Sequence, residues 1–208
     1  MSRTKRDQAK DERRAQLLSA ARKVFGEKGY HAATVDDITR AAGVAKGTFY
    51  LYFPEKKNIF YELIEGFFDR VTRAWRSVST DGAASAEVFF SRVEQAAHAL
   101  AEIFRDNRDL VRLTYRESMG LDDRLESMVR EFYREMALVG ADNVRLGVEL
   151  GLFRDDIHPL VAAYAHIGMV ERVLLQWMFD RSAPEVKGLV HQVIEIGFRG
   201  MARSTTST

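Results

Sequence analysis

The sequence predicts an all-α protein of nine helices. Its 208 residues include only three prolines, and Ala, Leu, Glu and Arg, which favour helices, are abundant. Apolar residues recur at the i, i+3, i+4, i+7 spacing of one helix face, and no stretch shows the alternation of a half-buried strand. With 46% apolar and 29% charged residues, the composition is that of a globular protein.

The first helix is expected from residue 11 to residue 28. Its inward face carries Leu17, Ala20, Ala21, Val24 and Phe25. Gly29 follows directly, and glycine commonly ends a helix because it adopts the left-handed conformation without strain. The helix therefore presents one apolar stripe to a small core.

Two short helices follow, and together they have the form of a helix-turn-helix. The first begins at Thr34, whose hydroxyl can cap free backbone N–H groups, and Gly43 ends it. The second runs from about residue 45 to residue 52. The glycine between them supplies the turn.

Six further helices complete the chain. Pro54 is expected to open the fourth helix, because the first turn leaves its N–H groups unbonded and proline has none to lose. Residues 79–84 are expected to form a loop. Gly120 is expected to end the sixth helix, before the seventh begins, and Pro184 to start the ninth. Residues 159–179 are apolar nearly all round, which predicts a helix buried on more than one side.

Composition excludes several classes of protein. Without cysteine there is no disulfide scaffold, no cysteine-ligated zinc site and no thiol nucleophile. Residues 159–170 form an uncharged apolar stretch that is shorter than the roughly 20 residues needed to span a bilayer. The basic N-terminus is not followed by an apolar signal core, so a cytoplasmic protein without a membrane partner is expected.

The net charge of +1 hides an asymmetry along the chain. Residues 1–57 contain 13 Lys and Arg against 7 Asp and Glu, a balance of +6, whereas the other 151 residues contain 18 against 23, a balance of −5. This pattern is typical of a front segment that meets a polyanion, although a solvated charged arm would show it too.

The third helix carries the residue types that bind duplex DNA. Lys46 can donate to guanine or neutralise a phosphate, Gly47 lets the backbone come close to the groove floor, and Thr48 suits a thymine methyl. The hydroxyls of Tyr50 and Tyr52 are of the kind that reach phosphate oxygens. A further expected phosphate ligand is Lys56, near the start of the fourth helix.

These residues belong to a longer pattern. Residues 29–38 (GYHAATVDDI), 42–50 (AGVAKGTFY) and 52–56 (YFPEK) closely resemble the DNA-binding domain of TetR-type transcriptional regulators. The similarity covers about residues 11–64. Ala45 departs from the capping serine that is common in that family, and Leu51 stands where a polar or aromatic residue is frequent.

The resemblance implies a nine-helix TetR-like fold and a homodimeric, ligand-responsive repressor. It implies a DNA-binding helix-turn-helix domain over residues 1–54 and a ligand-binding and dimerisation domain over residues 55–208. Transferred by position, the residues that face the major groove would be Lys46, Gly47, Thr48 and Tyr50. Those that hold phosphates would be Thr34, Tyr52 and Lys56.

The last two helices are the expected dimer surface, since their apolar residues exceed what one seam within a chain can bury. Gly168 and Gly197 could permit close helix approach. The two helix-turn-helix domains of the dimer would then bind half-sites about 34–36 Å apart, or a multiple of that spacing. A larger monomer core is the alternative.

A ligand site is expected among the middle helices, which are rich in aromatic residues and methionine. The candidate lining residues are Phe67, Trp75, Phe104, Tyr115, Glu117, Phe132, Met136, Asn143 and His166. An apolar effector is expected, such as an acyl thioester or an aromatic compound. The polar members would fix its polar end, unless they bond with one another or face solvent. The fourth helix, which joins the two parts, would transmit release from DNA.

An enzyme is not expected, and neither is a cofactor or a metal. The five histidines lack metal-ligand spacing, and there is no phosphate loop or serine elbow. Two alternatives remain, an architectural DNA-binding protein without a ligand and a purely structural helical dimer.

Overall fold

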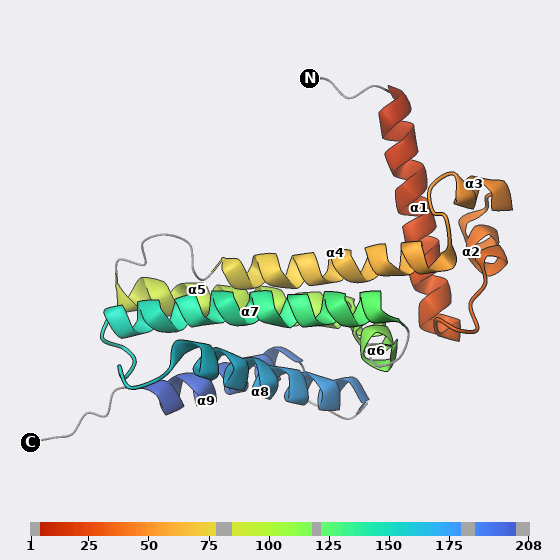
Figure 1. The fold of residues 1–208 in the computed structure, drawn as a ribbon. Coiled ribbons are helices and arrows are strands. Elements are labelled where there is room, and N and C mark those ends of the chain that lie inside the picture. Colours follow the sequence, from red (N-terminus) through yellow and green to blue (C-terminus); the bar gives the residue numbers. More distant parts are fainter. Residues whose placement is uncertain (1–4, 78–84, 118–121, 180–185, 203–208) are drawn as a thin grey trace, which may run out of the picture. The chain divides into compact units, whose positions relative to one another are not determined.

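The computed structural model describes residues 5–77, 85–117, 122–179 and 186–202, and these residues form nine helices (Figure 1). The helices are α1 Lys5–Lys28, α2 Val35–Ala42, α3 Lys46–Tyr50, α4 Lys56–Arg76, α5 Ala86–Asp106, α6 Arg108–Glu117, α7 Asp123–Glu149, α8 Pro159–Phe179 and α9 Val186–Met201. The predicted all-α fold is confirmed.

Most predicted helix limits agree with the structure, and the differences have local causes. Helix α8 has the predicted bounds. Helix α1 begins at Lys5 rather than at residue 11, because the exposed residues ahead of its apolar stripe are also good helix formers. The prediction that Pro54 opens α4 was wrong: Pro54 lies in a bend and α4 begins two residues later, where the side chain of Asn58 accepts a hydrogen bond of 3.1 Å from the backbone N–H of Glu55. The whole of the expected loop 79–84, together with Gly120 and Pro184, falls outside the described residues.

The predicted caps around α2 are present. Gly29 and Gly43 have φ of 78° and 65°, in the left-handed region that favours glycine. Thr34 Oγ1 accepts a hydrogen bond from the backbone N–H of Asp37 at 3.1 Å, and the Asp37 carboxylate accepts one from the backbone N–H of Thr34, also at 3.1 Å. This capping box fixes where α2 begins.

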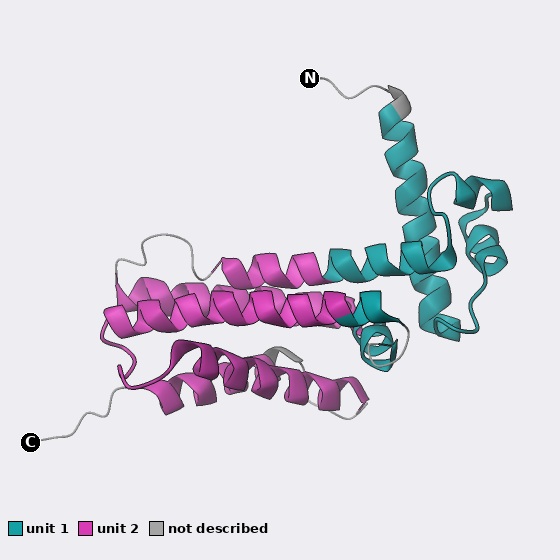
Figure 2. Ribbon diagram, in the orientation of Figure 1, with its two compact units in different colours: residues 1–67, 109–126 teal, residues 68–108, 127–208 magenta. Residues whose placement is uncertain are grey.

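The chain divides into two compact units, coloured separately in Figure 2. Unit 1 consists of residues 1–67 and 109–126, and unit 2 consists of residues 68–108 and 127–208. The limits between the units fall within α4, at the start of α6 and within α7, so α4 and α7 both contribute to both units.

Unit 1 is built around an aromatic cluster. The ring of Phe60 on α4 lies 5.6 Å from the ring of Phe25 on α1 and 4.7 Å from that of Tyr30. Polar contacts attach α6 to the same unit. Arg22 donates two hydrogen bonds to the carboxylate of Asp109, at 2.8 and 2.7 Å. The first three helices are thereby fixed to the start of α4 and to α6.

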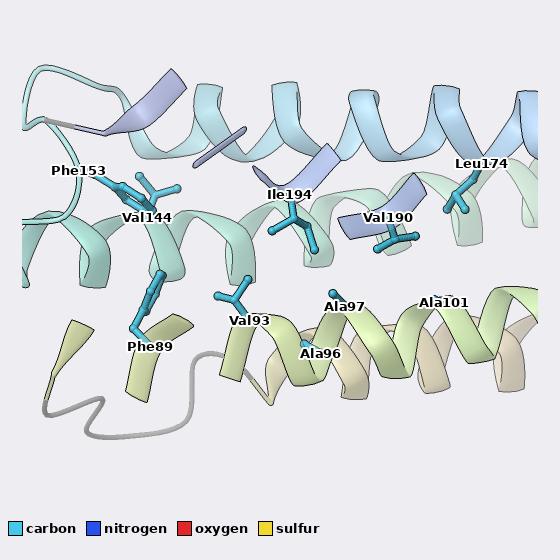
Figure 3. Close-up of a cluster of buried hydrophobic side chains, with 10 residues drawn as sticks. All are labelled: Phe89, Val93, Ala96, Ala97, Ala101, Val144, Phe153, Leu174, Val190 and Ile194. Atoms are coloured by element: carbon cyan, nitrogen blue, oxygen red, sulfur yellow. The ribbon is translucent and has the colours of Figure 1, made fainter. Parts of the chain in front are cut away.

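Unit 2 has a core formed by α5, α7, α8 and α9, with Phe153 from the α7–α8 connection (Figure 3). Its buried members are Phe89, Val93, Ala96, Ala97, Ala101, Val144, Phe153, Leu174, Val190 and Ile194. Phe153 lies directly against Gly147, where a Cβ would come within 2.2 Å of the phenyl ring. The sharp return of the chain uses Gly151, whose φ is 73°.

Candidate functional site

Helix α3 is a short element held from beneath by buried aromatic residues. Phe49 is fully buried, Phe53 is 1% exposed, and their ring centroids lie 5.7 Å apart. Its N-cap, Ala45, makes no side-chain hydrogen bond, so packing rather than capping holds α3. Because the apolar side is anchored, the opposite side has a fixed orientation in unit 1.

The outward side of α3 is open. Lys46, Gly47 and Tyr50 are exposed, and Thr48 is half-buried. A Cβ at Gly47 would meet nothing within 4 Å, so the space above this backbone is free. Leu51, which caps the C-terminal end of α3, is 79% exposed. A large apolar side chain in water beside a basic residue is typical of a surface that meets a partner.

Lys46 already has an anionic neighbour within unit 1. Its ammonium lies 3.0 Å from an oxygen of Asp36 on α2, and this contact raises the pKa of Lys46. Both side chains are more than half exposed, so the pair contributes little to stability. Lys46 is therefore charged and can exchange Asp36 for another acceptor at small cost.

Unit 2 contains a cavity near one end of its core. It is lined by Trp75, Phe89, Val93, Gly140, Asn143, Val144, Phe153, Ala162, Ala163, His166, Phe198 and Met201. Its empty volume is about 410 Å³, including the part that opens to solvent. The lining is mainly apolar, with three polar side chains, as is usual for a small-molecule site.

Those three polar side chains come from α4, α7 and α8. The rings of Trp75 and His166 are nearly parallel, 13° apart, with centroids 6.3 Å from each other. Asn143 and His166 are 6% and 8% exposed. Burial lowers the pKa of His166 to about 4, so the imidazole is neutral at pH 7.

Comparison with known families decides the kind of protein. Residues 17–63 match the family described as "Bacterial regulatory proteins, tetR family", and residues 90–201, more than half of the chain, match "Tetracyclin repressor-like, C-terminal domain". The chain belongs to the TetR family. It is therefore a DNA-binding transcriptional regulator with a helix-turn-helix, as the resemblance implied.

Relatives of similar length support the TetR assignment. The chain is 28% identical over 199 residues to the HTH-type transcriptional repressor KstR2 of Rhodococcus jostii (strain RHA1), with 93% of each chain covered. It is 26% identical over 190 residues to the uncharacterized HTH-type transcriptional regulator YdgC of Bacillus subtilis (strain 168), covering 91% of this chain and 93% of that one.

Solved structures of the TetR family share the fold. A SmeT–triclosan complex has a TM-score of 0.80 at 20% identity, with 95% of each chain covered, and SmeT is the repressor of a multidrug efflux pump of Stenotrophomonas maltophilia. FadR from Bacillus subtilis in complex with stearoyl-CoA has a TM-score of 0.74 at 21% identity, covering 90% of this chain and 98% of that one.

Two predicted phosphate ligands of the TetR pattern are engaged inside unit 1. The ammonium of Lys56 donates to the backbone carbonyls of Tyr30 and Ala33, at 2.7 Å each, and lies 4.4 Å from the centroid of the Tyr30 ring. Burial lowers the pKa of Lys56. The hydroxyl of Thr34 serves the capping box of α2. Lys56 thus holds the turn between α1 and α2 in this conformation.

Tyr52 is the third residue that was predicted to hold a phosphate. Its side chain is half-buried, and its backbone carbonyl accepts a hydrogen bond of 3.4 Å from Arg14. Arg14 also pairs with Glu62 and lies 4.6 Å from the centroid of the Phe53 ring. The segment that follows α3 is therefore tied to α1 and α4.

Of the predicted ligand-binding residues, three line the cavity of unit 2: Trp75, Asn143 and His166. Those outside its lining are Phe67, Phe104, Tyr115, Glu117, Phe132 and Met136. Glu117 lies in unit 1, 2.9 Å from His31, and Tyr115 is exposed on α6. Phe132 stacks on Phe68 at 4.2 Å.

Several residues that form the cavity wall were not predicted from the sequence. Gly140 lies one turn before Asn143 on α7, and Phe153 and Phe198 come from the connection before α8 and from α9. A glycine three residues before a polar residue on an apolar stripe was the available signal. The aromatic residues gave none, because burial in a core and exposure to a cavity leave the same pattern in a sequence.

Gly197 packs within the chain. A Cβ there would lie 2.4 Å from His166 Nδ1, so this glycine admits the imidazole between α8 and α9. Gly168, the other glycine expected to permit close approach, is exposed and has nothing within 4 Å of a Cβ position.

The described residues contain neither a candidate metal site nor a candidate membrane span. No three His, Asp or Glu side chains gather there in a way that would hold a metal ion. None of the described helices combines the length and the apolar character needed to cross a membrane.

Proposed function

We propose that the chain is a repressor that binds operator DNA as a homodimer through α3 and leaves it when an apolar small molecule occupies unit 2. The observation that carries the proposal is the outward side of α3. There Lys46, Gly47 and Tyr50 are exposed together on a helix whose other side is anchored by fully buried aromatic rings. Lys46, Gly47, Thr48 and Tyr50 would meet the major groove, and Tyr52 and Thr34 would meet phosphates.

Lys56 needs a separate role in this proposal. Its ammonium donates hydrogen bonds to carbonyls of the α1–α2 connection. We infer that it orients this connection, so that its contribution to DNA binding is mainly indirect. A phosphate contact would require the ammonium to give up part of that bonding.

A homodimer through α8 and α9 is supported by apolar residues that the monomer leaves in water. Val161 and Tyr164 on one face of α8 are 65% and 48% exposed, and Ile196 on α9 is 62% exposed. Gly168 continues the α8 face and leaves room for a partner helix. Pairing with a second copy would bury these residues. It would also place the two helix-turn-helix domains about 34 Å apart, or a multiple of that spacing, on DNA.

The cavity of unit 2 supports a ligand-responsive regulator over an architectural protein without a ligand, which would need a solid core. Relatives include a repressor in complex with triclosan and a regulator in complex with stearoyl-CoA. A ligand that favours a conformation with low DNA affinity must itself bind more weakly when DNA is bound. Because α4 directly follows the helix-turn-helix in the chain and belongs to both units, it is the proposed connection. A domain boundary near residue 54 and a cytoplasmic, non-catalytic role belong to the same proposal.

The proposal is tested by selecting genomic fragments of the source organism with the purified full-length chain. The expected fragments contain an inverted repeat, and their affinity should fall steeply with salt, because several phosphates are contacted. Fragments that compete no better than random DNA of equal length would refute the proposal. Binding by one protomer without a repeated sequence would refute the homodimer.

A further inference from the structure

The cavity of unit 2 contains a concentration of buried polar atoms without hydrogen-bond partners. Among the described residues, the buried side-chain atoms in this condition are Trp75 Nε1, both amide atoms of Asn143 and His166 Nδ1. All belong to residues that line the cavity. Asn143 and His166 are more than nine-tenths buried. Because buried polar groups in native proteins nearly always have a partner, this coincidence points to a bound molecule.

The unpartnered groups on α4 and α7 lie on neighbouring parts of the wall. A Cβ at Gly140 would be 3.7 Å from Trp75 Nε1, which places the indole N–H beside α7 at that residue. Asn143 is three residues further along α7, on the same face of the helix. The indole nitrogen only donates, whereas the amide of Asn143 donates and accepts. A molecule that satisfies both must have an acceptor and a donor at one end.

The charge of the cavity wall limits the molecule further. The lining contains no Asp, Glu, Lys or Arg, and its one ionisable side chain, His166, is neutral at pH 7. An anion buried there would lose its hydration without gaining a cationic partner. A carboxylate in the cavity is therefore disfavoured, whereas an uncharged amide or hydroxyl is not.

We propose that this cavity binds a compact, uncharged apolar molecule whose one polar end both accepts and donates hydrogen bonds. Trp75 and Asn143 are the residues that bond to this polar end. The inference rests on the proposed function only for the consequence of binding, since the chemistry of the wall is independent of DNA. It narrows the expected effectors, because a carboxylate or the anionic part of an acyl thioester of coenzyme A is disfavoured in this space.

Three probes with the same phenylalkyl body test the proposal: 4-phenylbutanamide, 4-phenylbutanoate and butylbenzene. Binding to the full-length chain without DNA is measured by isothermal titration calorimetry at pH 7.5. The amide should bind at least about tenfold more tightly than either of the others, because it alone is neutral and bonds to both groups. Equal or tighter binding of the carboxylate or of butylbenzene would overturn the proposal. No measurable binding of the amide at its solubility limit would overturn it too.

Single substitutions test whether Asn143 causes the preference for the amide over butylbenzene. Asn143→Leu should remove the advantage of the amide over butylbenzene and leave the affinity for butylbenzene within about threefold. The matched control is Asn107→Leu, because Asn107 is also buried in unit 2 but accepts from Arg70 at 2.8 Å and donates to the carbonyl of Ile103 at 2.6 Å. This control should keep the preference for the amide. If the amide keeps its advantage over butylbenzene in Asn143→Leu, the assignment of Asn143 as its hydrogen-bond partner is overturned. If a variant fails to fold, the comparison of the three probes on the unmodified chain still decides the proposal.

Failure of this inference and failure of the proposed function give different results. If the amide binds with the expected preference but leaves the affinity for a selected DNA fragment unchanged, the cavity chemistry stands and the effector role is wrong. If the carboxylate is preferred while DNA is still bound selectively, the inference fails and the DNA-binding regulator remains.

Discussion

Replacing Gly197 with alanine should destabilise unit 2 and weaken binding of 4-phenylbutanamide in its cavity. The new Cβ would lie 2.4 Å from Nδ1 and 2.9 Å from Cε1 of His166, which is closer than side-chain atoms approach one another. The imidazole must move from its position beside Trp75, and such overpacking costs about 1–3 kcal/mol. The free energy of unfolding in urea and the affinity for the amide should both fall.

The matched control is Gly200→Ala in the same helix. Gly200 is exposed and a Cβ there would meet nothing within 4 Å, so this substitution should cause no loss of stability. Equal stability of the two variants would show that α9 does not constrain the imidazole. That result would contradict the claim that α8 and α9 pack closely at Gly197.

Acidification should destabilise the protein through His166. Burial lowers the pKa of this side chain to about 4, whereas in an unfolded chain it is about 6.5. Between these values the unfolded state binds more protons than the folded state. The stabilising contribution is therefore complete above about pH 6.5 and is lost as the pH falls toward 4, on the order of 3 kcal/mol in total.

The measurement is the free energy of unfolding of wild type and His166→Phe at pH 7.5, 6.0, 5.0 and 4.5. The difference between the two proteins should shift in favour of the variant as the pH falls, because phenylalanine does not titrate. The control variant His191→Phe removes an exposed histidine of α9 and should show a far smaller shift. A difference between wild type and His166→Phe that stays constant over this range would contradict the buried, neutral imidazole.

Features set by neighbouring residues in the sequence were predicted correctly. The side-chain cap at Thr34, the left-handed glycines at 29 and 43 and the bounds of α8 all depend on interactions within a few residues. Phe49 and Phe53, four residues apart, are both buried, which leaves the residues between them on the outward side. These local features were enough to place α3 and to indicate which of its residues face outward.

Features that depend on distant residues were not predictable. The carbonyls that surround Lys56 belong to residues 23 to 26 positions earlier, so the sequence showed a lysine beside a helix start and nothing of its use. The cavity likewise gathers residues from six segments between Trp75 and Met201. Polar residues on apolar stripes were visible, but their lack of a partner is a property of the folded chain.

The most direct test of the central claim, that the outward side of α3 reads duplex DNA, is the affinity of a double variant for a selected genomic fragment. Lys46→Ala with Tyr50→Ala should bind at least about tenfold more weakly than wild type and lose its preference over random DNA. The control variant Lys23→Ala with Tyr115→Ala removes an exposed lysine and an exposed tyrosine of the same unit and should bind within about threefold of wild type. Unchanged affinity and preference in the α3 variant would contradict the claim.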